Sequence, residues 1–158
     1  MPKNDFENVM VRSFNKYFKN NNIDGIAFRM IESKYTHQII DILVDSKNSK
    51  YYLAIEAKST KGDKLYFKSH FVEGQIESEN YYINKSGRTG YLAFEKRFGP
   101  GKPREAYLIP WKVVYERYKL FKETNNRLYN GFSYKEIQTI GKRLKREKGL
   151  YIIDNLQK

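Results

Sequence analysis

The chain has 158 residues, no cysteine and a net charge of +12 at pH 7, with 30 Lys and Arg against 18 Asp and Glu. Its apolar content of 40% and aromatic content of 16% exclude a disordered basic tail, and its length suits a single domain over residues 1–158. The absence of cysteine excludes disulfides, thiolate metal sites and a cysteine nucleophile. No apolar run is long enough to span a bilayer and the N-terminus lacks the core of a signal peptide, so we expect a cytoplasmic protein.

The first half of the chain predicts a helix followed by strands. Apolar residues recur at helical spacing over 5–20. A short strand is expected over 26–31, and the β-branched and aromatic content of 38–45 and 51–59 predicts two more. The turn-forming sequence SKNSK joins the last two, which are therefore expected to form a β-hairpin.

The second half predicts a helix, two strands and two further helices. These elements are expected over 70–85 (helix), 89–95 and 105–110 (strands), and 111–122 and 133–144 (helices). Ser133 and Glu136 are spaced as a capping box at the start of the last helix. This order of elements predicts an α/β or α+β fold.

The positive charge is unevenly distributed. Residues 96–104 contain four basic residues and no acid, and residues 142–148 contain five basic residues and one glutamate. Such runs are often only solvated surface, but two of them on a strongly basic chain favour a polyanionic partner, with nucleic acid ahead of an anionic membrane. Charge predicts binding and says nothing of chemistry.

The predicted hairpin brings two acids and a lysine to one place. If its loop sets Ser46 opposite Tyr51, Asp41 lies opposite Glu56, and directly opposite residues share a face of the sheet. Because side chains alternate along a strand, Lys58 projects on the same face as Glu56. A register slip of one residue would move Asp41 to the other face.

Two carboxylates in contact repel each other and need a positive charge beside them. Lys58 can neutralise one of them as a simple cross-strand ion pair, which is the structural alternative. A divalent cation neutralises both, and carboxylate oxygens are ligands that Mg²⁺ accepts. Such an ion polarises a phosphoryl oxygen and activates water, so this set on a basic protein favours phosphodiester hydrolysis.

Asp41 and the sequence Glu56-Ala57-Lys58 resemble the D…ExK signature of the PD-(D/E)XK nuclease superfamily. The stretch KYYLAIEAKSTKGDKLYFKS is similar to the core of archaeal Holliday junction resolvases of the Hjc type, and Gln75-Ile76 resembles a pair in bacterial RecU resolvases. The similarity covers roughly residues 38–95. It implies a restriction-endonuclease-like α/β domain with a central mixed β-sheet flanked by helices.

The resemblance also implies roles for individual residues. Asp41 and Glu56 would bind Mg²⁺, for which Mn²⁺ would substitute, and Lys58 would be the catalytic lysine. Glu7 would be the N-terminal acid that completes the metal site, although an acid near a helix N-terminus is also favoured by the helix dipole. Gln75 matches a polar position near the metal in some members, or is a partly buried helix amide.

Further residues are candidates for contacts to DNA because they are basic or lie near this signature. His37 precedes Asp41 where resolvases often have serine, and a lone histidine is more often surface or core. The DNA-contact candidates are Arg29, His37, Lys61, Lys64, Lys68, Gln75, Lys96, Arg97, Lys102 and Arg104.

The expected function is a metal-dependent, structure-selective DNA endonuclease, with Holliday junctions as the first substrate. Paired cuts in a symmetric junction require two matched sites, which predicts a homodimer. One alternative is a PD-(D/E)XK nuclease that acts on linear duplex or on ends, like a restriction enzyme. Another is a catalytically inactive DNA-binding domain, which the intact acids and lysine argue against.

Overall fold

The computed structural model describes residues 5–30, 39–154 and 156, so the candidate His37 lies outside the described residues. The N-terminal half contains α1 (Asp5–Asn20), β1 (Gly25–Arg29), β2 (Ile42–Ser46), the 3-10 helix η1 (Ser49–Tyr51), β3 (Leu53–Thr60), β4 (Lys64–Tyr66), α2 (Phe67–His70) and α3 (Gln75–Ser86). The C-terminal half contains β5 (Thr89–Lys96), β6 (Glu105–Pro110), α4 (Trp111–Thr124), η2 (Arg127–Tyr129), β7 (Gly131–Ser133), α5 (Tyr134–Ile140), β8 (Lys142–Leu144), β9 (Arg146–Glu147) and β10 (Leu150–Tyr151). None of the helices in these described ranges is long and apolar enough to cross a membrane.

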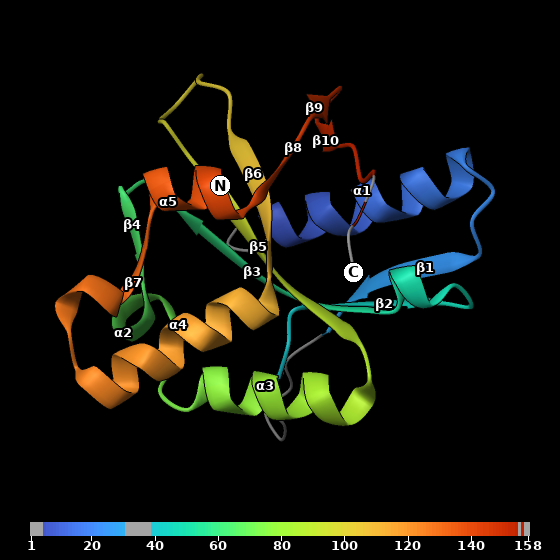
Figure 1. Cartoon of the computed structure of the whole chain (residues 1–158). Helices are drawn as coiled ribbons and strands as arrows, with labels where there is room; N and C mark the ends of the chain where they lie inside the picture. Colours follow the sequence, from blue (N-terminus) through green and yellow to red (C-terminus); the bar gives the residue numbers. More distant parts are fainter. Residues whose placement is uncertain (1–4, 31–38, 155, 157–158) are drawn as a thin grey trace.

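A six-stranded sheet in the order β1-β2-β3-β5-β6-β8 forms the centre of the fold (Figure 1). The neighbours β3 and β5 are parallel, and the other neighbouring pairs are antiparallel. Helices cover this sheet, which confirms the predicted α/β class with a mixed sheet flanked by helices. The parallel pair is joined by α2 and α3, as a parallel connection requires a long crossover.

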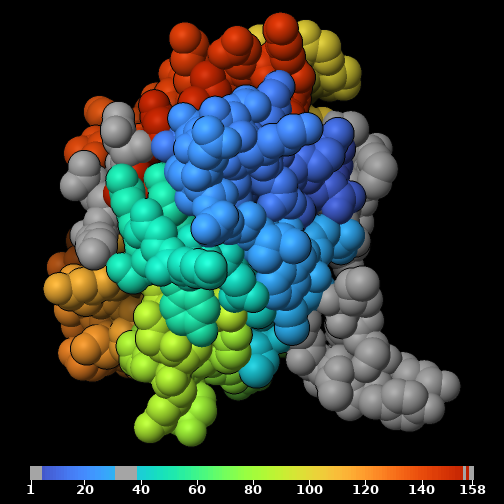
Figure 2. All heavy atoms as spheres, turned by 90° about the vertical axis from the view of Figure 1, so that its right-hand side faces the viewer, coloured from blue at the N-terminus to red at the C-terminus, as the bar shows by residue number. Residues whose placement is uncertain are grey.

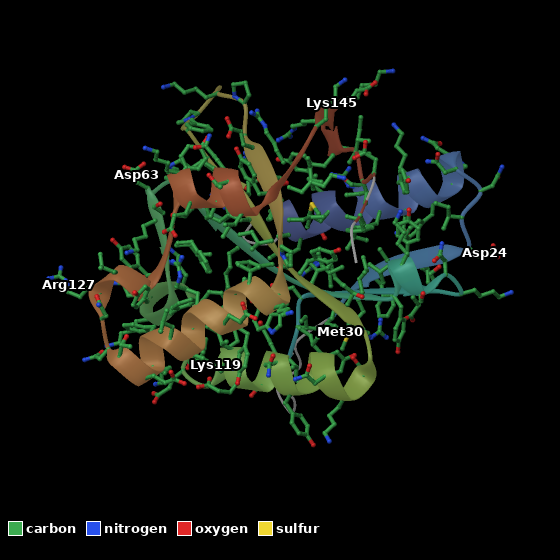
Figure 3. All side chains as sticks on the ribbon, viewed as in Figure 1. Asp24, Met30, Asp63, Lys119, Arg127 and Lys145 are labelled. Carbon is green, nitrogen blue, oxygen red and sulfur yellow. The ribbon has the colours of Figure 1, made fainter. Side chains whose placement is uncertain are left out.

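Two apolar layers hold the helices against the sheet. On one face, Met10 and Phe14 of α1 pack in the same buried cluster as Val44 and Leu53 of the sheet. On the other face, α3, α4 and α5 contribute to a second cluster that includes Ala54 of β3. Figure 3 shows side chains filling the space on both sides of the sheet. Each strand of the hairpin therefore has two buried faces, and a polar residue on either one must find a partner.

The register of the β2-β3 hairpin agrees with the prediction. Ile42 pairs with Ile55, and Val44 pairs with Leu53. Continuing this register outward by one residue sets Asp41, which directly precedes β2, opposite Glu56 of β3. The sequence therefore predicted the pairing that brings the two acids to the same end of the hairpin.

Two of the predicted helices differ in extent from those in the structure. The helix expected over 70–85 is two helices, α2 and α3, separated at 71–74 because Gly74 has a φ of +81° and forms the N-cap of α3. The helix expected over 133–144 begins with the predicted Ser133–Glu136 capping box but ends at Ile140. Residues 142–144 form β8 instead, which pairs with β6 and buries Leu144 in the layer beneath α1.

A close backbone approach secures the β4-β7 pair, which carries Lys64 next to the end of β3. A Cβ added at Gly131 would lie 1.9 Å from the backbone oxygen of Leu65. We therefore expect Gly131→Ala to lower the free energy of unfolding by about 3 kcal/mol, the upper end of the range for overpacking. Chemical denaturation measures this effect. Gly62→Ala is the control, since its Cβ would be 3.4 Å from Thr60 Oγ1, and equal stability of the two variants would contradict the prediction.

Candidate active site

Glu56 and Lys58 project from β3 toward α3, on the same face as Ala54. The Lys58 Nζ atom lies 3.2 Å from Glu56 Oε2 and 4.6 Å from the centre of the Phe71 ring. Glu56 is almost fully buried, whereas the Lys58 side chain is 19% exposed. The ammonium group therefore lies between a buried carboxylate and solvent, where it can reach a bound anion.

Asp41 is fixed at the point where β2 begins. Its backbone oxygen accepts a hydrogen bond from Met30 N at 2.8 Å, and its Oδ2 accepts one from Ala57 N at 2.9 Å. The aspartate side chain thus bonds the backbone of β3 between Glu56 and Lys58. The acid is buried, and its negative charge is one of the influences that raise the pKa of Glu56. The structure brings Asp41, Glu56 and Lys58 together.

Helix α3 adds a third buried acid, Glu79, that sequence analysis missed. Gln75 Nε2 donates hydrogen bonds to Glu56 Oε2 at 2.6 Å and to Glu79 Oε1 at 2.8 Å. Gln75 Oε1 accepts a bond from Val72 N at 2.9 Å, which fixes the orientation of the amide. The signal in the sequence was the four-residue spacing between Gln75 and Glu79, which places both on one side of a helix.

Burial is the main reason that Glu56 and Glu79 resist ionisation. Desolvation raises the pKa of Glu56 well above its usual value, and the charges of Glu79 and Asp41 raise it further, while Lys58 opposes the rise. Desolvation also raises the pKa of Glu79 to about 7, against hydrogen bonds from Glu56 and Gln75 that lower it. The geometry therefore favours a proton or a cation between Glu56 and Glu79 at neutral pH.

The raised pKa of Glu79 makes stability depend on pH. The folded state binds a proton more tightly than the unfolded chain, so stability falls as pH rises from about 4.5 to about 7. Glu79→Gln removes this titration, so the variant should lose less stability than the wild type as pH rises. The change in the free energy of unfolding on substitution should be more favourable at pH 8 than at pH 4, by up to about 3 kcal/mol. Denaturation in EDTA at both pH values measures it, with the exposed Glu116→Gln as control. An unchanged pH dependence in Glu79→Gln would contradict the assignment.

Unpaired carboxylate oxygens show where a cation fits. Glu56 Oε1 and Glu79 Oε2 are buried and have no hydrogen-bond partner among the described residues. Carboxylate oxygens suit Mg²⁺, which needs only one or two protein carboxylates and completes its shell with water and phosphate. The predicted ligands Asp41 and Glu56 have this donor chemistry and would hold the ion, with Glu79 as a further carboxylate next to Glu56.

That Glu7 joins Asp41 and Glu56 as a metal ligand stays a prediction. Within the described ranges there is no group of three or more His, Asp and Glu residues placed to hold an ion. Glu7 is instead paired with Arg29, whose Nε lies 3.1 Å from Glu7 Oε2. Burial raises the pKa of Glu7, and the charge of Asp41 raises it further, so the glutamate is near the site but its carboxylate is held by the arginine. Arg29, predicted to contact DNA, thus has an intramolecular partner.

The other candidates for DNA contacts differ in exposure and in ion pairing. Lys61, Lys68 and Lys102 are exposed, and Lys64 is half-buried. Arg97 and Arg104 are half-buried and form ion pairs with Glu95 at 3.3 and 3.5 Å.

Lys96 corrects the prediction of a phosphate contact. It is 4% exposed, and its Nζ donates hydrogen bonds of 2.8 Å to the backbone oxygens of both Lys61 and Gly62. An ammonium group held inside the fold by carbonyls stabilises the turn after β3 and does not face solvent. The charge run in the sequence did not distinguish this buried lysine from its exposed neighbours.

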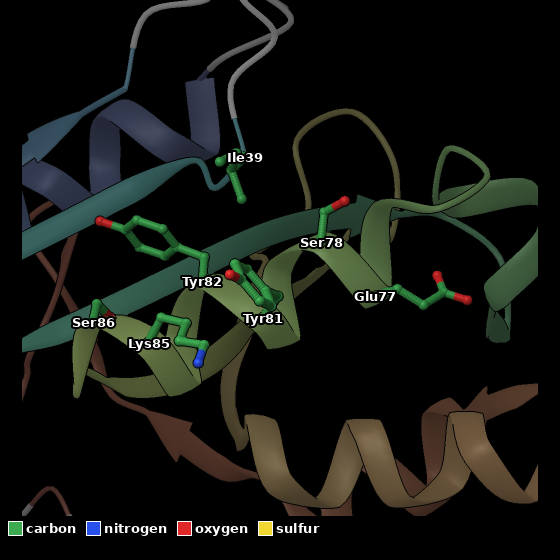
Figure 4. A pocket seen from close by; sticks show the side chains of 7 residues that line it. All are labelled: Ile39, Glu77, Ser78, Tyr81, Tyr82, Lys85 and Ser86. Atoms are coloured by element: carbon green, nitrogen blue, oxygen red, sulfur yellow. The ribbon is translucent and has the colours of Figure 1, made fainter.

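A hollow of about 630 Å³ lies on the outer side of α3, away from the site just described (Figure 4). Tyr81, Tyr82 and Lys85 line it together with Ile39. Gln75 and Glu79 are not among its lining residues, so the hollow is separate from the catalytic candidates.

Comparisons with known proteins found a similarity in structure but none in sequence. No family model matches the chain, and no curated protein matches it in sequence. The structure is similar to that of Hjc, a Holliday junction resolvase from the archaeal hyperthermophile Archaeoglobus fulgidus, with a TM-score of 0.43 and 19% sequence identity. The match covers 65% of this chain and 77% of the Hjc chain.

Proposed function

We propose that this protein is a metal-dependent DNA endonuclease. The observation that carries the proposal is the convergence of Asp41, Glu56 and Lys58, with an unpaired buried oxygen on Glu56. A solitary ion pair would need only one acid beside Lys58, whereas this site buries two further carboxylates next to the first. The net charge of +12 supports a phosphodiester polyanion as the substrate.

Each residue of the site would have a separate role in the reaction. Asp41 and Glu56 would hold a divalent ion, which would supply Lewis-acid chemistry toward the scissile phosphate and water. Lys58 places a positive charge at the solvent side of Glu56, where it stabilises the charge that develops on the phosphate. Gln75 holds Glu56 in position through a 2.6 Å hydrogen bond.

For the substrate, we propose branched DNA and in particular the four-way junction. This choice is supported by the resemblance of residues 50–69 to the core of archaeal junction resolvases. Two matched active sites would be supplied by a homodimer. Phosphate contacts would position the DNA by its shape, without reading its bases.

A panel of DNA substrates tests this function. The chain with Mg²⁺ is expected to cut a synthetic four-way junction by paired, symmetric nicks and to spare a linear duplex of the same sequence, and light scattering should report a dimer. EDTA should stop cleavage. Similar digestion of the linear duplex would favour the restriction-like alternative. Binding without cleavage in either Mg²⁺ or Mn²⁺ would favour the inactive DNA-binding domain.

A further inference from the structure

A second hollow, of about 560 Å³, is lined mainly by cationic side chains. Arg12, Lys102, Arg104 and Arg146 contribute four positive charges to its wall, against the single carboxylate of Asp5. None of these basic residues belongs to the site of Asp41, Glu56 and Lys58. We name this feature the basic hollow.

Three segments that are distant in sequence form the basic hollow. Residues Asp5, Val9 and Arg12 face it from one side of α1, at helical spacing. The loop between β5 and β6 supplies Lys102 and Arg104, and the β9-β10 hairpin supplies Arg146. In Figure 2 the C-terminal segment and the β5-β6 loop, red and yellow, lie at one end of the molecule beside the blue α1.

The wall keeps an excess of positive charge. Arg104 is neutralised in part, since its Nη1 lies 2.8 Å from Asp5 Oδ2 and 3.5 Å from Glu95 Oε2. Arg12 and Lys102 form no ion pair within the described part of the chain, and Arg146 lies over the Tyr151 ring at 5.3 Å. Several cations held around one hollow repel each other, and an anion bound among them removes that repulsion.

Two tight turns contribute glycines to the lining of the basic hollow. Gly101 has a φ of +74°, and Lys148 and Gly149 at the tip of the β9-β10 hairpin have φ values of +52° and +81°. Positive φ at both central residues is the signature of a type I′ turn, which suits a tight two-residue hairpin. The turn places Gly149, without a side chain, on the lining, so the backbone leaves room for a ligand.

We propose that the basic hollow binds a backbone phosphate of the DNA strand whose scissile phosphate lies at Lys58. This inference rests on the proposed function and extends it to a second contact with the substrate. The first turn of α1 separates the two places: Asp5 faces the hollow, and Glu7 faces Arg29 and Asp41 on the other side. A helix is about 10 Å across and successive nucleotides of one strand rise about 3.4 Å, so a strand that passes α1 crosses the width of the helix in a few nucleotides.

The lining favours a phosphate over a free nucleotide. The residues that line the basic hollow include no aromatic side chain on which a base can stack. Arginine guanidinium groups bind phosphate oxygens with paired donors, and three of the four cations are arginines. The ligand chemistry is therefore that of a phosphate group, and the remaining question is whether DNA supplies it.

DNA binding without cleavage tests the proposal. We expect the double variant Arg12→Gln, Arg146→Gln to bind duplex and four-way junction about tenfold more weakly in EDTA. The slope of log K against log salt should fall by about 1, since the hollow holds one phosphate and each lost phosphate contact removes about 1. Arg12→Gln alone, at an exposed position of α1, should also lower the slope, so the test does not depend on Arg146 and its contact with Tyr151.

The control is Lys19→Gln, Lys47→Gln, which removes the same charge from exposed positions at the C-terminal end of α1 and in the β2-β3 loop, at the end of the hairpin opposite Asp41 and Glu56. Equal losses of affinity and slope in both double variants would overturn the inference, as would an unchanged slope at Arg12→Gln. Calorimetry with inorganic pyrophosphate distinguishes a DNA phosphate from a free phosphate ligand. If the Arg12→Gln, Arg146→Gln variant no longer binds pyrophosphate but binds DNA as the wild type does, the hollow binds a free ligand and the inference is overturned. Failure of the unaltered chain to bind any DNA would instead refute the proposed function itself.

Discussion

Glu56→Gln and Asp41→Asn are each expected to reduce Mg²⁺-dependent DNA cleavage by about 1,000-fold or more while DNA binding is retained. Each change removes one anionic oxygen ligand from the pair that would hold the ion, and loss of a metal that contributes several kcal/mol to the transition state has an effect of this size. The two amides keep the shape of the acids, so the β2-β3 register is preserved. Single-turnover cleavage rates and binding by fluorescence anisotropy give the two readouts.

Matched controls distinguish this effect from the general loss of one negative charge. Asp24→Asn and Glu116→Gln remove a carboxylate from exposed positions outside the site and should leave the cleavage rate unchanged. Wild-type rates in either Asp41→Asn or Glu56→Gln would refute the metal site. Loss of DNA binding together with cleavage would assign the acids a structural role instead.

Lys58→Met is expected to lower the single-turnover cleavage rate by about 100- to 10,000-fold, with little change in DNA affinity. Methionine keeps the apolar stem over Phe71 but removes the charge that lies 3.2 Å from Glu56 Oε2. A positioned charge or proton donor at a reacting group contributes effects of this magnitude. Lys47→Met, at an exposed position in the hairpin loop, is the matched control.

The consequences of Lys58→Met for the neighbouring acid separate catalysis from folding. Since Lys58 lowers the raised pKa of Glu56, its removal should raise that pKa further and shift the pH at which cleavage begins to a higher value. A rate reduced equally at every pH, with a destabilised fold, would point to the alternative in which Lys58 serves only as an ion-pair partner.

Some contacts in the site depend on distances between elements that no local pattern encodes. Glu79 is a helical residue with ordinary acidic neighbours in sequence, and it belongs to the site only because α3 packs against β3. Glu7 was predicted to be a ligand, but Arg29 lies close enough on β1 to bind its carboxylate. The same holds for Lys96, whose two carbonyl partners lie in the turn after β3.

The amino-acid sequence by itself predicted the hairpin register, because the turn sequence SKNSK suggested a loop that sets Ser46 opposite Tyr51, and the structure has the same register. That register was enough to bring Asp41, Glu56 and Lys58 together. Only the tertiary structure decided which charges remain available, since ion pairing and burial depend on how helices and turns pack across the sheet. Glu79 and the basic hollow around Arg12 were therefore found only in the tertiary structure, which also shows that Lys96 is buried.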